Sequence, residues 1–178
     1  MTSLPLHPAI VHLPLGLAFV IPALAAGFAW ALWTGRVRPR GAWVAVIALQ
    51  AVLLGGGLVA MNTGEREEER VERIVPDAAI ERHEEYAEQF VWAVGLTLVA
   101  AILVLAFRKP ALVRSMAAIT VVGSLVAVAA AIRVGHAGGQ LVYAHNAGAA
   151  YAAKGQQTMS GGEPGVVEGR QHRPDDNR

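Results

Sequence analysis

Histidine is the residue type in this sequence that is best suited to chemistry. The chain contains six histidines and no cysteine. A neutral imidazole is a good ligand for zinc, copper and haem iron. The lack of cysteine excludes thiolate zinc sites, cysteine-ligated iron–sulfur clusters and covalently attached c-type haem. A site built from histidine alone therefore fits b-type haem, copper or zinc.

Five of the histidines are candidate ligands, and their spacing ranks them. His7 and His12 are five residues apart, which is about 140° around a helix, so they do not share one ligand face. We expect His12 to lie nearer the axis of a helical bundle than His7. The preferred ligands for haem or a metal ion are therefore His12, His83 and His136, with His7 and His145 as second choices.

Arg133 lies just inside the last apolar stretch, where a charged group is expensive and is usually paired. Its partner would be Glu84, Glu88, a lipid phosphate or a haem propionate, because a guanidinium binds a carboxylate through two hydrogen bonds. The alternative is that its long side chain reaches the lipid headgroups without a protein partner. Arg133 therefore counts among the cofactor-binding candidates.

Glycines follow Arg133 in the segment Gly135–Tyr143. They predict an interruption of the last helix at the membrane surface and a close approach of the backbone to a flat group. The residues Leu141–Lys154 would then form a short interfacial helix.

Four apolar stretches must position these residues. Hydrophobic residues make up 54% of the 178-residue chain and charged residues only 16%, against about 45–50% and about 25% in soluble domains. Each stretch is near the roughly 20 residues that cross the hydrocarbon core as a helix. The expected fold is all-α, an integral membrane four-helix bundle. Its spans cover residues 8–33, 42–61, 90–107 and 111–134.

The basic residues give this bundle an orientation. Arg36, Arg38 and Arg40 follow the first span, and Arg108 and Lys109 follow the third, with no acidic residue in either connection. Cytoplasmic loops carry the excess of lysine and arginine. Both termini and the five candidate histidines are therefore predicted outside, at the periplasmic face of a bacterial inner membrane.

The chain divides into a membrane domain and a tail. Residues 1–154 form the predicted membrane domain, which ends in an interfacial segment, 135–154. Residues 155–178, which include His172, are rich in glycine, proline, glutamine and charge and form a predicted disordered tail.

The connection between the second and third spans is strongly acidic. Residues 62–88 hold ten of the fourteen acidic residues of the chain, with four arginines. Their spacing is helical, and Pro76 followed by Asp77 predicts the start of a new helix that continues into the third span. One interpretation is an external helix pair with a solvated surface. The other is a surface that attracts cations or docks a partner.

Other catalytic and binding signatures are missing from the sequence. It has no phosphate-binding loop, no dinucleotide fingerprint and no zinc-protease motif. No nucleophile with a general base is visible, so an enzyme activity of the chain by itself is not predicted. The acidic connection disfavours nucleic-acid binding.

Four short motifs resemble those of a known family. The chain opens with His7-Pro8-Ala9-Ile10-Val11-His12-Leu13-Pro14, and Thr63-Gly64-Glu65 follows the second span. His83 leads into the third span, and Gly135-His136, Gly138-Gly139 and Leu141-Val142-Tyr143 form a closing motif. Together they resemble the bacterial membrane family known as domain-of-unknown-function family 2231, although Leu13 replaces an aromatic residue and Asn146 a glycine. The resemblance implies a four-helix membrane protein, sometimes linked to cytochrome or Rieske-type modules, with no established activity.

Two functions are consistent with these features. The first is a membrane electron-transfer protein, in which two of His12, His83 and His136 bind a b-type haem and electrons pass between the quinone pool and a periplasmic or membrane redox partner. The second is a subunit without a redox role, which carries copper, zinc or no metal and serves the assembly of a membrane complex. A small transporter is less favoured, because no span carries Asp or Glu at mid-depth. The composition makes the lipid bilayer a partner, while the ligand pairing and the homo- or hetero-oligomeric state stay open.

Overall fold

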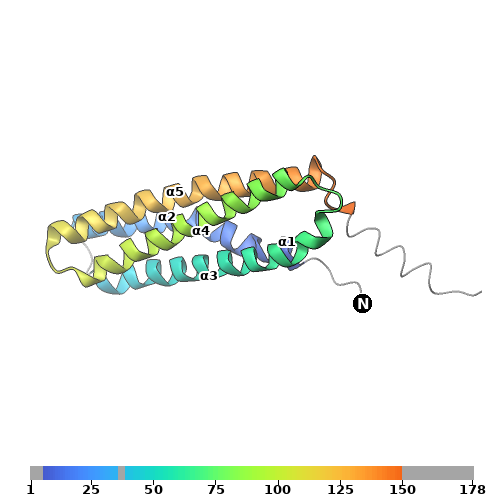
Figure 1. The fold of residues 1–178 in the computed structure, drawn as a ribbon. Helices are drawn as coiled ribbons and strands as arrows, with labels where there is room; N and C mark the ends of the chain where they lie inside the picture. Colours follow the sequence, from blue (N-terminus) through green and yellow to red (C-terminus); the bar gives the residue numbers. More distant parts are fainter. Residues whose placement is uncertain (1–5, 36–38, 150–178) are drawn as a thin grey trace, which may run out of the picture.

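The protein is a bundle of long antiparallel helices, as the sequence predicts. The computed structural model describes residues 6–35 and 39–149. Figure 1 shows the four long helices side by side, with a short helix at the N-terminal end. The helices are α1 (Leu6–Ile10), α2 (His12–Trp33), α3 (Pro39–Val71), α4 (Asp77–Ala106) and α5 (Pro110–Tyr143).

The helices α1 and α2 are almost one continuous helix. The backbone of Val11 between them is still helical, and its carbonyl accepts a hydrogen bond from Leu15 N at 3.1 Å. The neighbouring bond is missing because Pro14 has no N–H to donate to Ile10. The chain therefore does not turn between the two helices, and α1 continues in the direction of α2 beyond the apolar stretch.

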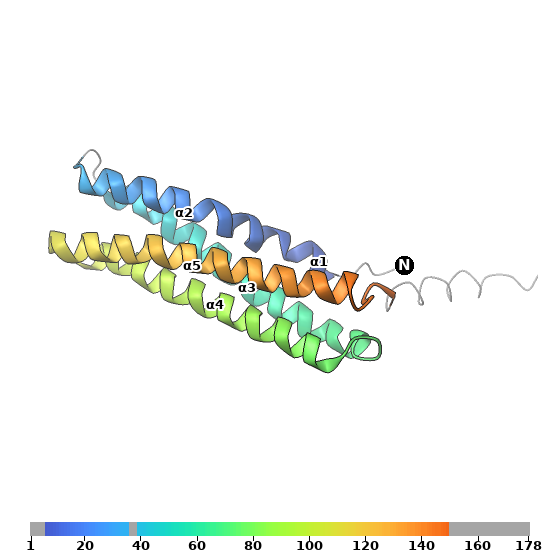
Figure 2. The same ribbon diagram turned by 90° about the horizontal axis from the view of Figure 1, so that it is seen from above.

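The long helices contact one another in cyclic order: α2 packs on α3, α3 on α4, α4 on α5 and α5 on α2. The view from above in Figure 2 shows the same arrangement. The contact between α4 and α5 is the most extensive. At its centre Gly123 lies so close to Thr97 that a Cβ at Gly123 would overlap the Thr97 hydroxyl. Small residues at helix contacts allow this close approach of the backbones.

Buried residues recur every seven positions along each helix, as they do in left-handed helical bundles. This core register places residues from different helices in layers across the bundle. Its buried members include Pro14 and Ile21 on α2; Trp43, Gln50 and Gly57 on α3; Phe90, Thr97 and Val104 on α4; and Ala117, Ser124 and Ala131 on α5.

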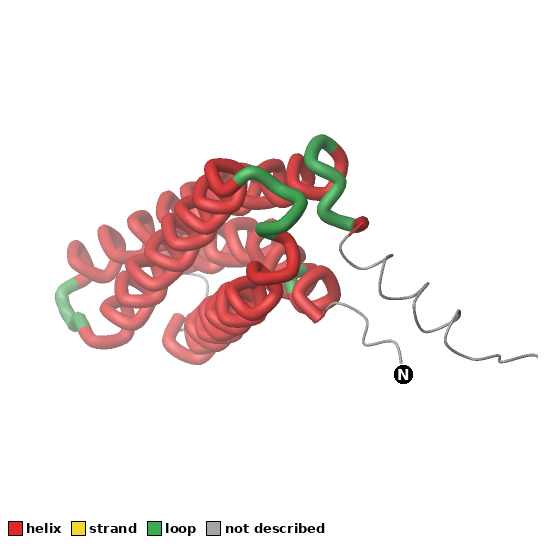
Figure 3. The backbone as a smooth tube through the Cα atoms, turned by 45° about the vertical axis from the view of Figure 1, so that its right-hand side comes forward, coloured by secondary structure: helices red, strands yellow, loops and turns green. Residues whose placement is uncertain are grey.

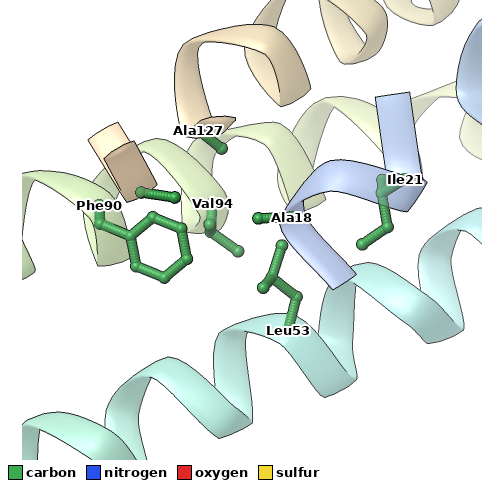
Figure 4. Close-up of a cluster of buried hydrophobic side chains, with 7 residues drawn as sticks. Ala18, Ile21, Leu53, Phe90, Val94 and Ala127 are labelled. Carbon is green, nitrogen blue, oxygen red and sulfur yellow. The ribbon is translucent and has the colours of Figure 1, made fainter. Parts of the chain in front are cut away.

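Two apolar clusters fill most of the core. The first contains Ala18, Ile21, Leu53, Phe90, Val94, Ala127 and Ala131 and is drawn in Figure 4. The second contains Ala25, Ala29, Trp43, Val46, Val104 and Ala117. Beside it the Trp43 indole donates a hydrogen bond to the Ala101 carbonyl at 2.9 Å, which ties α3 to α4. A small third cluster, of Val75, Ile80 and Ala147, lies under the turn between α3 and α4.

The outer face of the bundle is apolar. Trp92, Leu96 and Val122 are between 60% and 70% exposed, and all four long helices are long and apolar enough to cross a membrane. A continuous apolar surface of this size is unfavourable in water and favourable in lipid. The predicted class, a multi-pass membrane protein with four candidate spans, agrees with this surface.

Three helices extend well beyond their predicted spans, α3 and α4 into the acidic segment and α5 past residue 134 to Tyr143. Most of the acidic segment 62–88 is helical, because α3 continues to Val71 and α4 begins at Asp77, where the proline signal predicted a helix start. The green turn between α3 and α4 in Figure 3 lies at the same end of the bundle as α1 and the C-terminal end of α5. We call this the acidic end.

The prediction that glycines interrupt the last helix is wrong. The helix α5 runs without a break through Gly135 and Gly139 to Tyr143. Its carbonyls keep their helical partners, and packing against α4 outweighs the low helix propensity of glycine. The predicted interfacial helix, Leu141–Lys154, begins inside α5 and ends outside the described residues, and the predicted tail, 155–178, lies outside them.

Candidate metal centre

His7 and His83 meet at the acidic end of the bundle. His7 belongs to α1 and His83 to the second turn of α4, and their rings are perpendicular, with centroids 6.2 Å apart and an interplanar angle of 88°. The antiparallel topology also places His12, His136 and His145 at this end. The five candidate histidines therefore lie toward one end of the bundle, while the prediction that this end is the outer face of the membrane stays a prediction.

His7 is held in place by α3. Its Nδ1 lies 2.9 Å from the Ala60 carbonyl oxygen and 3.4 Å from Thr63 Oγ1. A carbonyl only accepts, so a neutral His7 carries its proton on Nδ1 and a lone pair on Nε2. The backbone N–H of His7 donates to Glu67 Oε1 at 3.5 Å, which joins the start of α1 to the acidic part of α3.

His83 has one nitrogen bound and one free. The ring forms a hydrogen bond with the backbone of Val134 on α5. Its Nδ1 is buried and has no hydrogen-bond partner within the described residues. In the neutral tautomer that is protonated on Nε2, Nδ1 keeps a lone pair that no described protein group satisfies.

The pKa of His83 favours the neutral form. His83 lies before the apolar part of α4, which begins at Phe90. Burial lowers its pKa below the ordinary value of 6.5, the charge of His7 lowers it further, and the Val134 carbonyl acts in the opposite direction. A neutral imidazole is the form that binds a metal ion.

Two glycines make room for the two rings. A Cβ at Gly64 on α3 would lie 3.3 Å from Cε1 of His7, and a Cβ at Gly138 on α5 would lie 3.1 Å from Cε1 of His83. All four residues continue the core register, because each lies seven positions from a core residue. For Gly64, His83 and Gly138 that core residue is on the same helix, and for His7 it is on the adjoining helix α2. The pairs are His7 with Pro14, Gly64 with Gly57, His83 with Phe90 and Gly138 with Ala131. The centre is thus one layer of the bundle, to which α1, α3, α4 and α5 contribute, and we call it the histidine layer.

Carboxylates surround the approach to this layer. Glu84 follows His83 on α4 and faces Glu68 on α3. Burial raises the pKa of Glu84 above its ordinary value of 4.5, and the charge of Glu68, a hydrogen bond with Glu68 and the charges of Glu65 and Glu88 raise it further. Glu84 is therefore protonated more readily than an isolated carboxyl is. Negative charge concentrated here attracts cations to the acidic end.

The remaining candidates lie at the surface. His12 and His136 are exposed, and His136 Nε2 accepts a hydrogen bond from Gln140 Nε2 at 3.2 Å. The prediction that His12 lies nearer the bundle axis than His7 is wrong, because the core register passes through His7. His145 is half-buried beyond the end of α5, and Arg133 is exposed on α5.

The sequence named Gly64 and Gly138 in its motifs without predicting that each packs against a histidine, and it placed His7 second to His12. The seven-residue spacing of Gly64 from Gly57 and of Gly138 from Ala131 is visible in the sequence and would have identified them. Among residues 6–35 and 39–149, no group of three or more histidine, aspartate or glutamate side chains is arranged to hold a metal ion. The chain therefore offers two imidazole nitrogens, from His7 and His83, and leaves other coordination positions open.

Comparison with known proteins adds the family. The profile described as "Predicted membrane protein (DUF2231)" matches residues 3–151. The chain matches no curated protein and no solved structure.

Proposed function

Since the chain belongs to the DUF2231 family of predicted membrane proteins, we propose that it is a membrane subunit that binds a transition metal ion, copper or zinc, at its acidic end. The ligands are Nε2 of His7 and Nδ1 of His83. The observation that carries the proposal is the pairing of these imidazoles, each with one nitrogen tied to a carbonyl of another helix and the other nitrogen free.

The two rings lie slightly farther apart than two imidazoles that share an ion, so binding would draw them together by a few tenths of an ångström. Metal–imidazole bonds are about 2.0–2.1 Å long, so two imidazoles on one ion have centroids about 5–6 Å apart. The observed separation of His7 and His83 is 6.2 Å. The carbonyls of Ala60 and Val134 take the role of the outer partners that fix the tautomer and orientation of histidine ligands.

A site with only two protein ligands is expected to release and rebind its metal ion readily. Structural zinc sites are closed by four protein ligands, whereas this layer supplies two, so water or a group from a partner protein would have to complete the coordination. An open site next to a carboxylate-rich surface suits the transient capture or transfer of an ion. This agrees with an assembly or metal-handling subunit better than with a structural metal site.

Haem-linked electron transfer stays a prediction, and the residues do not fit it well. His12 and His136, two of the three preferred haem ligands, are exposed. His7 and His83 each pack against a glycine of a neighbouring helix, so a porphyrin between them would have to separate the helices of the layer. A bare ion needs no such separation.

The experiment is a metal titration of the full chain in nanodiscs, purified with a tag that lacks histidine. We expect one copper or zinc ion per chain after chelator treatment and reloading, measured by elemental analysis. His7→Ala and His83→Ala should weaken binding about tenfold or more, while His12→Ala and His136→Ala should bind as the unaltered chain does. Full binding by His83→Ala would refute the proposal. A Soret band that disappears in His12→Ala or His136→Ala would instead support the haem hypothesis.

We propose that the acidic end faces the periplasm of a bacterial inner membrane, with both termini outside. The arginine-rich connection after α2 and the basic turn between α4 and α5 support this orientation. Because the chain has no cysteine, single cysteines report it directly. A membrane-impermeant maleimide should label Glu72→Cys, in the turn between α3 and α4, on intact cells and should not label Arg108→Cys.

A further inference from the structure

Polar side chains lie in the middle of the apolar core. Within the described residues, four polar side chains are buried: Gln50 on α3, Thr97 on α4, and Thr120 and Ser124 on α5. Gln50 is 0% exposed, and neither its Nε2 nor its Oε1 has a hydrogen-bond partner. A primary amide carries two donors and an acceptor with two lone pairs, so this side chain is an unsatisfied polar group of considerable size.

The core register places Gln50, Thr97 and Ser124 in one layer. Each lies fourteen residues from a member of the histidine layer on the same helix, namely Gly64, His83 and Gly138. Fourteen residues correspond to about 21 Å along a helix. We call Gln50, Thr97 and Ser124 the mid-depth layer.

Contacts between helices support this register. Gly57 packs against Phe90 on one side of the layer, and the Trp43 indole bonds to Ala101 on the other side. Gln50 lies midway between Gly57 and Trp43 on α3. It therefore falls opposite the part of α4 that carries Thr97.

The hydroxyls of the layer can accept hydrogen bonds. Thr97 Oγ1 donates to the Ala93 carbonyl at 2.6 Å, and Ser124 Oγ donates to the Val121 carbonyl at 2.8 Å. Both protons stay within their own helices, which leaves oxygen lone pairs for another donor. The layer thus presents hydroxyl acceptors together with an amide that can both donate and accept.

We propose that the mid-depth layer binds an internal water molecule, held by the Gln50 amide and the hydroxyl oxygens of Thr97 and Ser124. Water is the guest that fits, because every group of the layer is neutral and a water molecule both donates and accepts. A metal ion or other charged guest would lack a compensating charge at this depth.

The apolar clusters seal this site. The cluster around Phe90 separates it from the histidine layer, and the cluster around Trp43 and Val46 separates it from the opposite end. Water in the layer therefore exchanges slowly with bulk solvent. The layer binds water without forming a path across the membrane.

Nuclear magnetic resonance of the full chain in nanodiscs, with ¹⁵N-labelled glutamine, tests the proposal. The Gln50 side-chain amide, assigned by its loss in Gln50→Leu, should show a cross-peak to water while exchanging at least tenfold more slowly than the exposed amide of Gln140. The cross-peak should weaken in Thr97→Val and in Ser124→Ala, because each variant removes a hydroxyl oxygen that holds the water.

Two results would overturn the proposal. One is a Gln50 amide that contacts protein atoms and no water, and the other is an amide that exchanges as fast as that of Gln140. Gln50→Met replaces Gln50→Leu for the assignment if the leucine variant does not fold.

Discussion

The contact between Gly138 and His83 leads to a quantitative prediction. An added Cβ at Gly138 would lie 3.1 Å from Cε1 and 3.5 Å from Nδ1 of His83, so the ring must move by a few tenths of an ångström. The next residue, Gly139, has no atom within 4 Å of its added Cβ. Both glycines lie in the same turn of α5. The pair Gly138→Ala and Gly139→Ala therefore separates crowding of the histidine from the general effect of replacing glycine in a helix.

Gly138→Ala and Gly139→Ala should change the free energy of unfolding by different amounts and in different directions. Replacing a helical glycine by alanine stabilises a helix by about 1 kcal/mol, and Gly139→Ala should show this gain. Gly138→Ala makes the same gain, but crowding in a packed layer costs about 1–3 kcal/mol. We therefore expect Gly138→Ala to be neutral or destabilising and to lie about 1–3 kcal/mol below Gly139→Ala.

Reversible unfolding of both variants in the same detergent, followed by circular dichroism, measures this difference. The metal titration provides a second readout, because a displaced His83 should weaken binding in Gly138→Ala and not in Gly139→Ala. Equal stabilisation of the two variants, with equal metal binding, would refute the packing of His83 on Gly138.

Two further predictions concern protonation and packing. The pKa of His83 is lower in the folded chain than its ordinary value of 6.5, so its contribution to stability is present above pH 6.5 and is lost as the pH falls through the lowered pKa. The melting temperature of the unaltered chain, relative to that of His83→Gln, should therefore fall from neutral to mildly acidic pH, and this comparison removes the opposite contribution of Glu84, whose pKa is raised. Gly123→Ala should destabilise the bundle strongly because its methyl group would overlap the Thr97 hydroxyl, and the second change Thr97→Ala should restore much of the loss. Gly95→Ala, with open space around its added Cβ, is the control, and an equal melting temperature for the Gly123 and Gly95 variants would contradict the close approach.

Much of the fold follows from hydropathy and local signals. Four apolar stretches predict four long helices, and the pair Pro76 and Asp77 predicts where α4 begins. The helical spacing of charges in residues 62–88 also agrees with the helical extensions of α3 and α4. These features are set by residues close together in the sequence, so they can be predicted from one sequence without knowledge of the packing.

The choice between His7 and His12 could not be made in the same way. The first span is apolar on all sides, so hydropathy does not show which face points inward. The inward face is set by packing, and it follows the seven-residue line from His7 through Pro14 to Ile21. The glycines near His136 were misinterpreted for a related reason. Glycine ends helices in water, whereas in a tightly packed bundle it allows another side chain to approach the backbone.

The histidine layer exists only in the assembled bundle. Its two imidazoles come from α1 and α4, the carbonyls that orient them from α3 and α5, and its two glycines also from α3 and α5. No helix hairpin by itself contains all of these groups. A change that loosens α4 against α5 far from the layer should therefore weaken metal binding without altering any ligand. Measured on folded protein, the affinity of Gly123→Ala for copper or zinc should fall, and it should recover in the double variant with Thr97→Ala. If the affinity instead followed His7 and His83 alone, the two imidazoles would be sufficient by themselves, and the layer would have no part in holding the ion.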